Sequence, residues 1–149
     1  MEEPLRILIR YHDDGNGEPL QKIEKLSIGD WIDLRAAMDM HLYPGDFGII
    51  PLGVSMKLPE GYEAHIVPRS STFKHWGIIM TNGIGIVDNS YSGDGDIWGM
   101  PYYSFGTTDI HKNDRICQFR IVKKMPSVDL VEVEHLDGAD RGGFGSTGI

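Results

Sequence analysis

The sequence predicts an all-β domain of the sandwich or barrel class. Short apolar or alternating runs recur along the chain, and 19 glycines and 8 prolines interrupt them at short intervals. Only one short stretch has the end signals of a helix. With 149 residues, 40% of them hydrophobic and 24% charged, the chain suits one domain with a core of modest size.

Six runs have the length and composition of strands. They are residues 5–10, 47–52, 54–58, 62–67, 115–123 and 128–134. Gly53 separates the second run from the third, and Pro68 ends the fourth because proline cannot donate to a sheet. In the last run two valines alternate with two glutamates, which is the pattern of a half-buried strand.

The predicted helix covers residues 70–76. Ser70 and Ser71 are good N-cap residues, Gly77 is a typical stop, and the segment is only about two turns long. Because Arg69 precedes it, a guanidinium, two hydroxyls and helix amides could together bind a phosphate. In isolation, however, arginine and serine at a helix start more often form only a cap.

The segment from Asn82 to Gly93 is predicted as a hairpin with a binding role. Gly83 and Gly85 let backbone groups approach a ligand closely, so main-chain donors and acceptors can read a flat base. Asp88 follows a short apolar run and can act as a general base that activates water. The alternative is that Asp88 and its neighbour merely turn the chain.

Two later segments carry further polar candidates. Asp114 and Arg115 are predicted to turn the chain into the strand that carries Gln118, although structural roles are the default for all three. The last segment, residues 138–149, contains five glycines and cannot bury enough surface to fold alone. It is either a disordered tail or an arm whose amides and hydroxyls wrap phosphates, and its arginine and phenylalanine favour the arm.

The bulk properties exclude several classes of function. A net charge of −8 argues against a nonspecific binder of duplex nucleic acid, whereas a small polyphosphate can still bind where arginines gather with a metal ion. No apolar run approaches the roughly 18–20 residues of a membrane span. The acidic start lacks a signal-peptide pattern, so we expect a cytoplasmic protein.

The lone cysteine and the histidines are interpreted as structural. Cys117 cannot form an intramolecular disulfide, and its apolar neighbours predict a buried core residue. The six histidines have no zinc-site spacing. Trp98, Tyr102, Tyr103 and Phe105 are expected in the core or in a subunit contact.

Five segments, taken together and in this order, resemble the trimeric dUTPase family from residue 30 to the C-terminus. They are Asp30-Trp31-Ile32-Asp33-Leu34-Arg35-Ala36-Ala37, Pro68-Arg69-Ser70-Ser71, Gly85-Ile86-Val87-Asp88-Asn89-Ser90-Tyr91-Ser92-Gly93, Asp114-Arg115-Ile116-Cys117-Gln118 and Arg141-Gly142-Gly143-Phe144-Gly145-Ser146-Thr147-Gly148. Each segment alone is modest evidence, but five ordered matches are highly specific. The form of the first segment resembles a subgroup found in bacilli and their phages.

The resemblance implies a homotrimeric enzyme that hydrolyses dUTP to dUMP and pyrophosphate with Mg²⁺, keeping uracil out of DNA and supplying dUMP for thymidylate synthesis. The implied fold is a distorted jelly-roll-like barrel of the dUTPase or β-clip type, with one short helix and a flexible C-terminal arm. Residues 1–137 would form the catalytic barrel, and residues 138–149 the arm that closes over a neighbouring subunit's site.

The resemblance also implies roles for single residues. Asp88 would activate the water that attacks the α-phosphorus, and Asp33 would hold Mg²⁺ through water. Uracil and deoxyribose would be bound by Asn82, Gly85, Ile86, Val87, Tyr91, Ile97 and Phe144. The phosphates would be bound by Arg69, Ser70, Ser71, Gln118, Arg141, Gly145, Ser146 and Thr147. Tyr91 would exclude a 2′-hydroxyl, and Phe144 would stack on uracil, with Trp98 as the second candidate for that lid.

Three departures from the family pattern leave the local loop geometry open. Trp31-Ile32 stands in the first segment where the family commonly has Gly-Tyr. Ser71 follows Arg-Ser where the family usually has glycine, and Asn113 precedes Asp-Arg where glycine is also usual. The chemistry of the five segments does not depend on any of these residues.

Two other functions are weighed against dUTP hydrolysis. A dCTP deaminase shares the fold but needs a glutamate soon after the hairpin, and no glutamate occurs between Gly93 and Phe105. A dUTP-sensing regulatory binder would be expected to lose Asp88 or the arm, and both are present. A regulatory protein partner alongside catalysis stays open, and no nucleic acid or membrane is expected as a partner.

Overall fold

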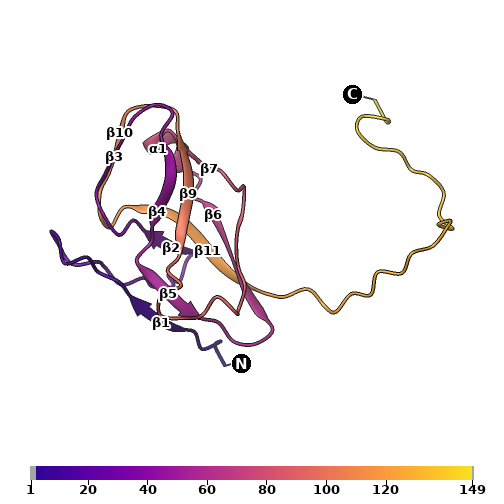
Figure 1. Cartoon of the computed structure of the whole chain (residues 1–149), viewed down its shortest axis with the longest axis horizontal. Helices are drawn as coiled ribbons and strands as arrows, with labels where there is room; N and C mark the ends of the chain where they lie inside the picture. Colours follow the sequence, from indigo (N-terminus) through magenta and orange to yellow (C-terminus); the bar gives the residue numbers. More distant parts are fainter. Residues whose placement is uncertain (1–2, 149) are drawn as a thin grey trace.

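The computed structural model describes residues 3–148 and consists mainly of strands and loops (Figure 1). The strands within these residues are β1 (Leu8–Tyr11), β2 (Ile32–Arg35), β3 (Met40–Leu42), β4 (Phe47–Pro51), β5 (Val54–Lys57), β6 (Tyr62–Pro68), β7 (Ile78–Met80), β8 (Gly85–Val87), β9 (Gly99–Ser104), β10 (Thr108–Ile110) and β11 (Arg115–Lys123). The helix α1 covers Thr72–Trp76. The prediction of an all-β fold with one short helix is confirmed. In this described part, no helix has the length and apolar composition to cross a bilayer.

The strands form four antiparallel sheets, arranged as a distorted jelly roll that does not close into one barrel. The largest sheet has the order β2-β11-β6-β8, and a three-stranded sheet has the order β4-β9-β7. Two ribbons, β1-β5 and β10-β3, complete the body. The last strand of the chain, β11, therefore lies between β2 and β6 rather than at an edge.

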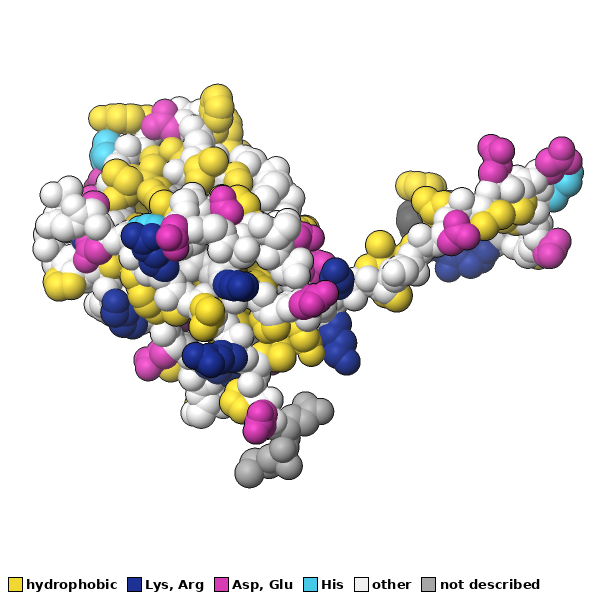
Figure 2. Space-filling model, turned by 60° about the horizontal axis from the view of Figure 1, so that its bottom comes forward, with side chains coloured by type: hydrophobic (Ala, Val, Ile, Leu, Met, Phe, Trp, Pro, Cys, Tyr) yellow, Lys and Arg dark blue, Asp and Glu magenta, His cyan; other side chains and the backbone are white. Residues whose placement is uncertain are grey.

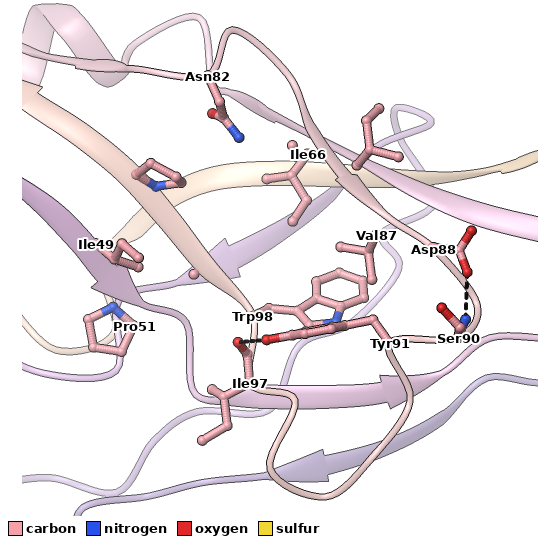
Figure 3. A pocket seen from close by; sticks show the side chains of 14 residues that line it. Ile49, Pro51, Ile66, Asn82, Val87, Asp88, Ser90, Tyr91, Ile97 and Trp98 are labelled. Atoms are coloured by element: carbon pink, nitrogen blue, oxygen red, sulfur yellow. Dashed lines mark hydrogen bonds between the residues drawn. The ribbon is translucent and has the colours of Figure 1, made fainter.

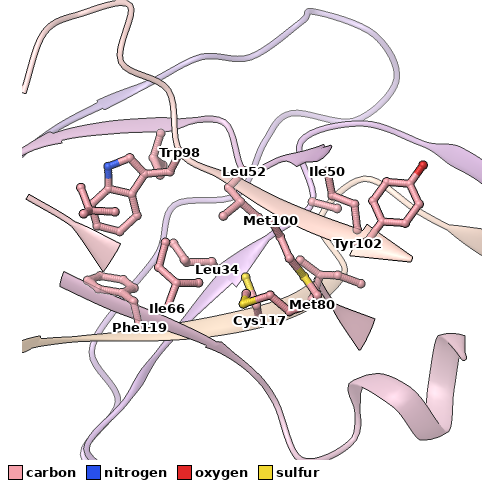
Figure 4. Close-up of a cluster of buried hydrophobic side chains, with 14 of the residues drawn as sticks. Leu34, Ile50, Leu52, Ile66, Met80, Trp98, Met100, Tyr102, Cys117 and Phe119 are labelled. Carbon is pink, nitrogen blue, oxygen red and sulfur yellow. The ribbon is translucent and has the colours of Figure 1, made fainter. Parts of the chain in front are cut away.

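The core lies between the two larger sheets (Figure 4). Trp98 and Phe119 pack edge to face, with ring centroids 5.3 Å apart, and Ile50 and Met100 are completely buried beside them. Cys117 is also buried, and burial raises the pKa of its thiol. The prediction that Cys117 is a core residue is confirmed by its burial. A buried, protonated thiol is not a nucleophile, so Cys117 is not a catalytic candidate.

Most of the long strands were predictable from local pattern. β4, β5, β6 and β11 form within one residue of the predicted ends, and β1 begins three residues later than predicted. The short strands β3, β7, β8 and β10 span only three residues each, which is too few to show an alternation in the sequence.

The prediction of a strand over residues 128–134 is wrong for the single chain. Residues 124–148 leave the body after β11 and run away from it with every side chain exposed (Figures 1 and 2). Leu130 is 91% exposed and Val131 is 71% exposed. The alternating pattern therefore has no sheet edge of its own chain to pair with, and a domain boundary at residue 138 stays a prediction.

The predicted hairpin from Asn82 to Gly93 is corrected by the sheet topology. The strand before it, β7, pairs with β9, whereas β8 pairs with β6. Residues 81–84 thus cross from one sheet to the other instead of joining two paired strands. This crossing leaves β8 as an edge strand of the four-stranded sheet.

Replacing Gly53 with alanine is expected to destabilise the fold by about 2–5 kcal/mol. Gly53 has a φ of +67°, and a Cβ there would lie 2.6 Å from Leu20 Cδ2 and 2.9 Å from Ala37 Cβ. Urea unfolding measures the loss. Gly61→Ala is the matched control, because Gly61 has a φ of +86° and no heavy atom within 4 Å of a Cβ. Equal losses in the two variants would contradict the packing explanation.

Candidate active site

A cavity of about 650 Å³ opens between the edge strand β8 and the strands β4 and β9 (Figure 3). Its lining includes six of the residues predicted to bind uracil and deoxyribose, namely Asn82, Gly85, Ile86, Val87, Tyr91 and Ile97. Asp88 lines the same cavity, and Ile49, Pro51 and Pro101 supply apolar surface. The fold therefore gathers the predicted nucleoside residues and the predicted general base in one place.

Asp88 follows β8 directly, and its carboxylate is held in place. The backbone N–H of Ser90 donates to Asp88 Oδ1 at 2.7 Å, and the N–H of Tyr91 donates to the Asp88 carbonyl at 3.0 Å. Hydrogen bonds from the Ser90 backbone and side chain hold the pKa of Asp88 below its usual value. Asp88 thus turns the chain, as the alternative predicted, and also presents an ionised carboxylate at the cavity.

The ring of Tyr91 is fixed at the cavity by its hydroxyl, which donates to the Ile97 carbonyl at 3.1 Å (Figure 3). Trp98 also lines the cavity, but its side chain is only 2% exposed. Its Nε1 has no hydrogen-bond partner within residues 3–148. Because a buried indole cannot swing over a ligand, Trp98 is excluded as the lid and belongs to the core, as its alternative interpretation predicted.

The edge strand β8 gives the cavity free main-chain groups. It pairs only with β6 in the described structure, so the backbone groups on its other edge are open to a ligand. Gly85 allows the close approach of the two strands, since a Cβ at Gly85 would lie 3.1 Å from the Ile66 Cβ. A base in the cavity could therefore be recognised by backbone donors and acceptors, as the glycines of this segment predict.

A second group of predicted residues meets at the other end of β6. Arg69 Nε lies 3.1 Å from Asp33 Oδ1 in an ion pair, and Arg115 Nη1 lies 3.4 Å from Asp33 Oδ2. Arg69 also donates to the Arg115 carbonyl at 3.2 Å, and Gln118 donates to the Pro68 carbonyl at 3.2 Å. Two guanidinium groups share one carboxylate here, which leaves positive charge available for an anion.

Two of the three departures from the family pattern, Ser71 and Asn113, are accommodated by the backbone. Ser71, the N-cap of α1, has φ −96° and ψ −3°, which any residue can adopt, and its side chain makes no capping hydrogen bond. Asn113 has a φ of +77°, the left-handed conformation that favours glycine and that asparagine also tolerates. Asn113 therefore keeps the left-handed backbone conformation that glycine would adopt there, and Ser71 needs no special conformation.

A hollow of about 400 Å³ lies at the paired arginines. Besides Arg69, its lining includes Asp114 and Arg115, which were polar candidates of the fourth segment. The remaining lining residues, His75, Trp76 and His111, were not predicted as site residues. His75 belongs to α1 and His111 to the turn after β10, so only the fold brings them together. His75 and His111 are 36 positions apart in the sequence, so no short spacing motif could have predicted that they line the same hollow.

Within one chain the two groups of residues lie far apart. Asp88 follows Val87, which pairs with Ala64 near the start of β6, whereas Arg69 follows the last residue of that strand. At roughly 3.3 Å per residue, the five residues from Ala64 to Arg69 span about 16 Å. The predicted general base and the arginine cluster therefore lie at opposite ends of β6 in the single chain.

The predicted arm residues are not brought to either hollow in the single chain. They are Arg141, Phe144, Gly145, Ser146 and Thr147. All of them lie in the segment that runs away from the body, and the Phe144 ring is fully exposed (Figure 1).

Comparison with known proteins establishes the family. A family model described as dUTPase matches residues 31–148. The chain belongs to the dUTPase family. It is 56% identical over 144 residues to the SPbeta prophage-derived deoxyuridine 5'-triphosphate nucleotidohydrolase of Bacillus subtilis, with 97% of this chain and 99% of the relative covered. This similarity agrees with the subgroup of bacilli and phages that the first segment resembles.

Solved structures of dUTPases share the fold. The dUTPase of Staphylococcus bacteriophage 80alpha, in a mutant with bound dUpNHpp, matches with a TM-score of 0.77 at 19% identity, covering 97% of this chain and 99% of that one. A mutant dUTPase from phage phi11 of S. aureus matches with a TM-score of 0.72 at 18% identity, covering 89% of this chain and 99% of that one. The jelly-roll-like architecture is thus the fold of dUTPases.

Proposed function

We propose that the chain hydrolyses dUTP to dUMP and pyrophosphate by attack of water on the α-phosphorus. The observation that supports this most directly is the cavity at β8, where Asp88, Tyr91 and open backbone groups meet in a member of the dUTPase family. The reaction keeps uracil out of DNA and supplies dUMP for thymidylate synthesis, and we assign it to the cytoplasm.

In this proposal the cavity selects the nucleoside. Uracil lies along the open edge of β8, where the segment Gly85–Val87 offers backbone groups, and close contact with that edge leaves no room for the methyl group of thymine. Tyr91 packs its ring on deoxyribose and excludes a 2′-hydroxyl. Asp88 takes a proton from the water that attacks the α-phosphorus, because its carboxylate is ionised and lines the same cavity.

The active site is completed by neighbouring subunits of a homotrimer. The distance of about 16 Å along β6 between Asp88 and the arginine cluster supports this arrangement, since a second subunit can bring its own arginine cluster closer to Asp88. We assign the phosphates to Arg69, Ser70, Ser71 and Gln118 of a second subunit. Arg115, which lines the hollow beside Arg69, adds positive charge to that side of the site.

The exposed C-terminal segment is assigned to the site of another subunit. The alternating residues 128–134 are exposed in the single chain, so they are free to pair with a neighbour's sheet edge. The Gly-rich part that follows then closes over the nucleotide. Phe144 stacks on uracil, and Arg141, Gly145, Ser146 and Thr147 contact the β- and γ-phosphates.

Mg²⁺ is the metal that we assign to this reaction, held mainly by the triphosphate and water. Within residues 3–148 no three His, Cys, Asp or Glu side chains gather to hold a metal. Asp33 is already paired with Arg69 and Arg115, which fits a contact through water better than direct coordination. The structure of the mutant dUTPase from phage phi11 shows how a structural Mg(II) ion is coordinated in that protein. When bound, the metal would neutralise phosphate charge.

The test is pyrophosphate release from dUTP, dCTP, dTTP and UTP in the presence of Mg²⁺. Release from dUTP alone is the expected result. Ammonia release from dCTP would indicate the deaminase that shares this fold. Binding of dUTP without release of pyrophosphate from any nucleotide would indicate the sensing function instead.

Replacing Tyr91 with alanine is expected to improve the use of UTP relative to dUTP by roughly tenfold, because the ring that blocks a 2′-hydroxyl is gone. The ratio of kcat/KM for the two nucleotides measures this. Tyr91→Phe is the matched control, since it keeps the ring and loses only the hydrogen bond to the Ile97 carbonyl. Unchanged discrimination in Tyr91→Ala would remove this role from Tyr91.

A further inference from the structure

The turn at residues 111–115 presents different side chains to its two sides. His111, Asp114 and Arg115 line the hollow that also contains Arg69. Lys112 and Asn113, which lie between His111 and Asp114 in the sequence, do not line that hollow. Both are buried, with exposed fractions of 8% and 7%. Whatever holds Lys112 and Asn113 therefore also sets the position of the residues that face the arginine cluster.

The Lys112 ammonium group is held entirely by the loop at residues 13–20. Its Nζ donates to Asp13 Oδ1 at 2.6 Å, to Asp14 Oδ1 at 2.9 Å and to the Asn16 carbonyl at 2.8 Å. These three acceptors match the three N–H donors of an ammonium group. The hydrogen bonds lower the pKa of both carboxylates and raise the pKa of Lys112, so all three groups are charged at neutral pH.

Asn113 joins the same loop through its side-chain amide. Its Oδ1 accepts from the Gln21 N–H at 2.8 Å, and its Nδ2 donates to the Pro19 carbonyl at 3.0 Å. Its backbone carbonyl accepts from Arg35 at 2.8 Å, and its N–H donates to the Ala36 carbonyl at 2.8 Å. Asn113 thus connects the loop to the end of β2, the strand that carries Asp33.

The loop is also anchored to the body at its start and end. At its end, the Leu20 side chain is 7% exposed and lies beside Gly53 of the body. The N–H of Leu20 donates to Asp13 Oδ2 at 2.9 Å, which closes the loop on itself. The N–H of His12 donates to the Gly53 carbonyl at 2.8 Å. An anchored loop can hold the 111–115 turn at a fixed position, which a free loop could not do.

We propose that Lys112 is a positioning residue for the triphosphate side of the site. With Asn113, it fixes the 111–115 turn against the 13–20 loop and thereby sets the position of Arg115, of its partner Asp33 and of Arg69. The chain of contacts is continuous, since Arg115 lies 3.4 Å from Asp33 and its carbonyl accepts from Arg69. The inference rests on the proposed function, because it assigns the arginine cluster to the phosphates.

The proposal predicts that the two sides of the site respond differently to Lys112→Met. The KM for dUTP and the inhibition constant of inorganic pyrophosphate should rise by roughly ten- to hundredfold, because the phosphate ligands are displaced. The inhibition constant of deoxyuridine, which has no phosphate, should change by less than about twofold. Lys112→Arg, which keeps the charge, should recover part of the affinity for pyrophosphate.

Two further variants separate the network from general effects of charge. Asp13→Ala with Asp14→Ala removes the two carboxylate acceptors of the same ammonium group, and its effect should not add to that of Lys112→Met. Lys22→Met is the matched control, since it makes the same change in an exposed lysine that contacts Tyr11 and lies outside the network. It should leave all constants unchanged.

An unchanged inhibition constant of pyrophosphate in folded Lys112→Met overturns the proposal, as does an equal loss of affinity for pyrophosphate and deoxyuridine. If Lys112→Met does not fold, Asp14→Ala, which removes one acceptor of three, is measured in the same way with the same two outcomes. If the wild type itself does not hydrolyse dUTP, the proposed function fails. Calorimetric binding of pyrophosphate to the wild type and Lys112→Met still decides the role of Lys112 in that case.

Discussion

Asp88→Asn is expected to reduce kcat for dUTP by roughly 10²–10⁴-fold while KM changes little. The amide keeps the size of the side chain and an oxygen that can accept from the Ser90 N–H, but it cannot take a proton from water. Steady-state measurement of pyrophosphate release gives both constants. A variant with wild-type kcat would show that another group activates the water.

Asp96→Asn is the matched control for Asp88→Asn. The Asp96 carboxylate also accepts a backbone hydrogen bond, from Gly93 at 2.9 Å, but Asp96 does not line the cavity. The pH dependence supplies a second check. Because hydrogen bonds from Ser90 hold the pKa of Asp88 below the usual value of an aspartate, the Asp88 carboxylate stays ionised as the pH falls to that usual value, and its negative charge is lost only at lower pH. A loss of activity above that range must come from another group.

Truncation after Leu136 is expected to leave a folded trimer whose kcat/KM for dUTP is lower by roughly a hundredfold or more. The change removes Arg141, Phe144 and the amides and hydroxyls assigned to the β- and γ-phosphates. The body should be unaffected, since every residue of the removed segment that the structure describes is exposed in the single chain. Light scattering measures the oligomer, and pyrophosphate release measures the activity.

A chain in which residues 137–149 are replaced by glycine and serine of equal length is the control for the truncation. It restores length without Arg141 or Phe144, so it should be as inactive as the truncated chain. Full activity in the truncated chain would show that this segment is not a catalytic arm. Recovery with the glycine-serine segment would show that its composition is irrelevant.

The nucleoside side of the site could be predicted because it is local. Asn82, Asp88, Tyr91 and Ile97 lie within one stretch of the sequence, and one cavity contains all four. The strands β6 and β11 were predicted for a similar reason, since each is long enough to show its pattern.

The triphosphate side could be predicted only in part because it depends on contacts between distant segments. His75 and His111 meet at one hollow only after α1 and the 111–115 turn are placed. The pairing of Asp33 with two arginines, and of Lys112 with Asp13 and Asp14, likewise joins residues far apart in the sequence. The alternating pattern of residues 128–134 predicted a strand, but a local pattern cannot show whether a neighbouring strand of the same chain is available for pairing.

The central position of β11 has a consequence for how the chain folds during its synthesis. β11 separates β2 from β6, so the four-stranded sheet cannot form until the last strand has left the ribosome. Until then the nascent chain exposes two unpaired strand edges, and the contacts that close the body are distant in sequence, which slows folding. The 25 described residues after Lys123 lie outside the body and add no strand to this sheet, so its closure depends on β11 alone.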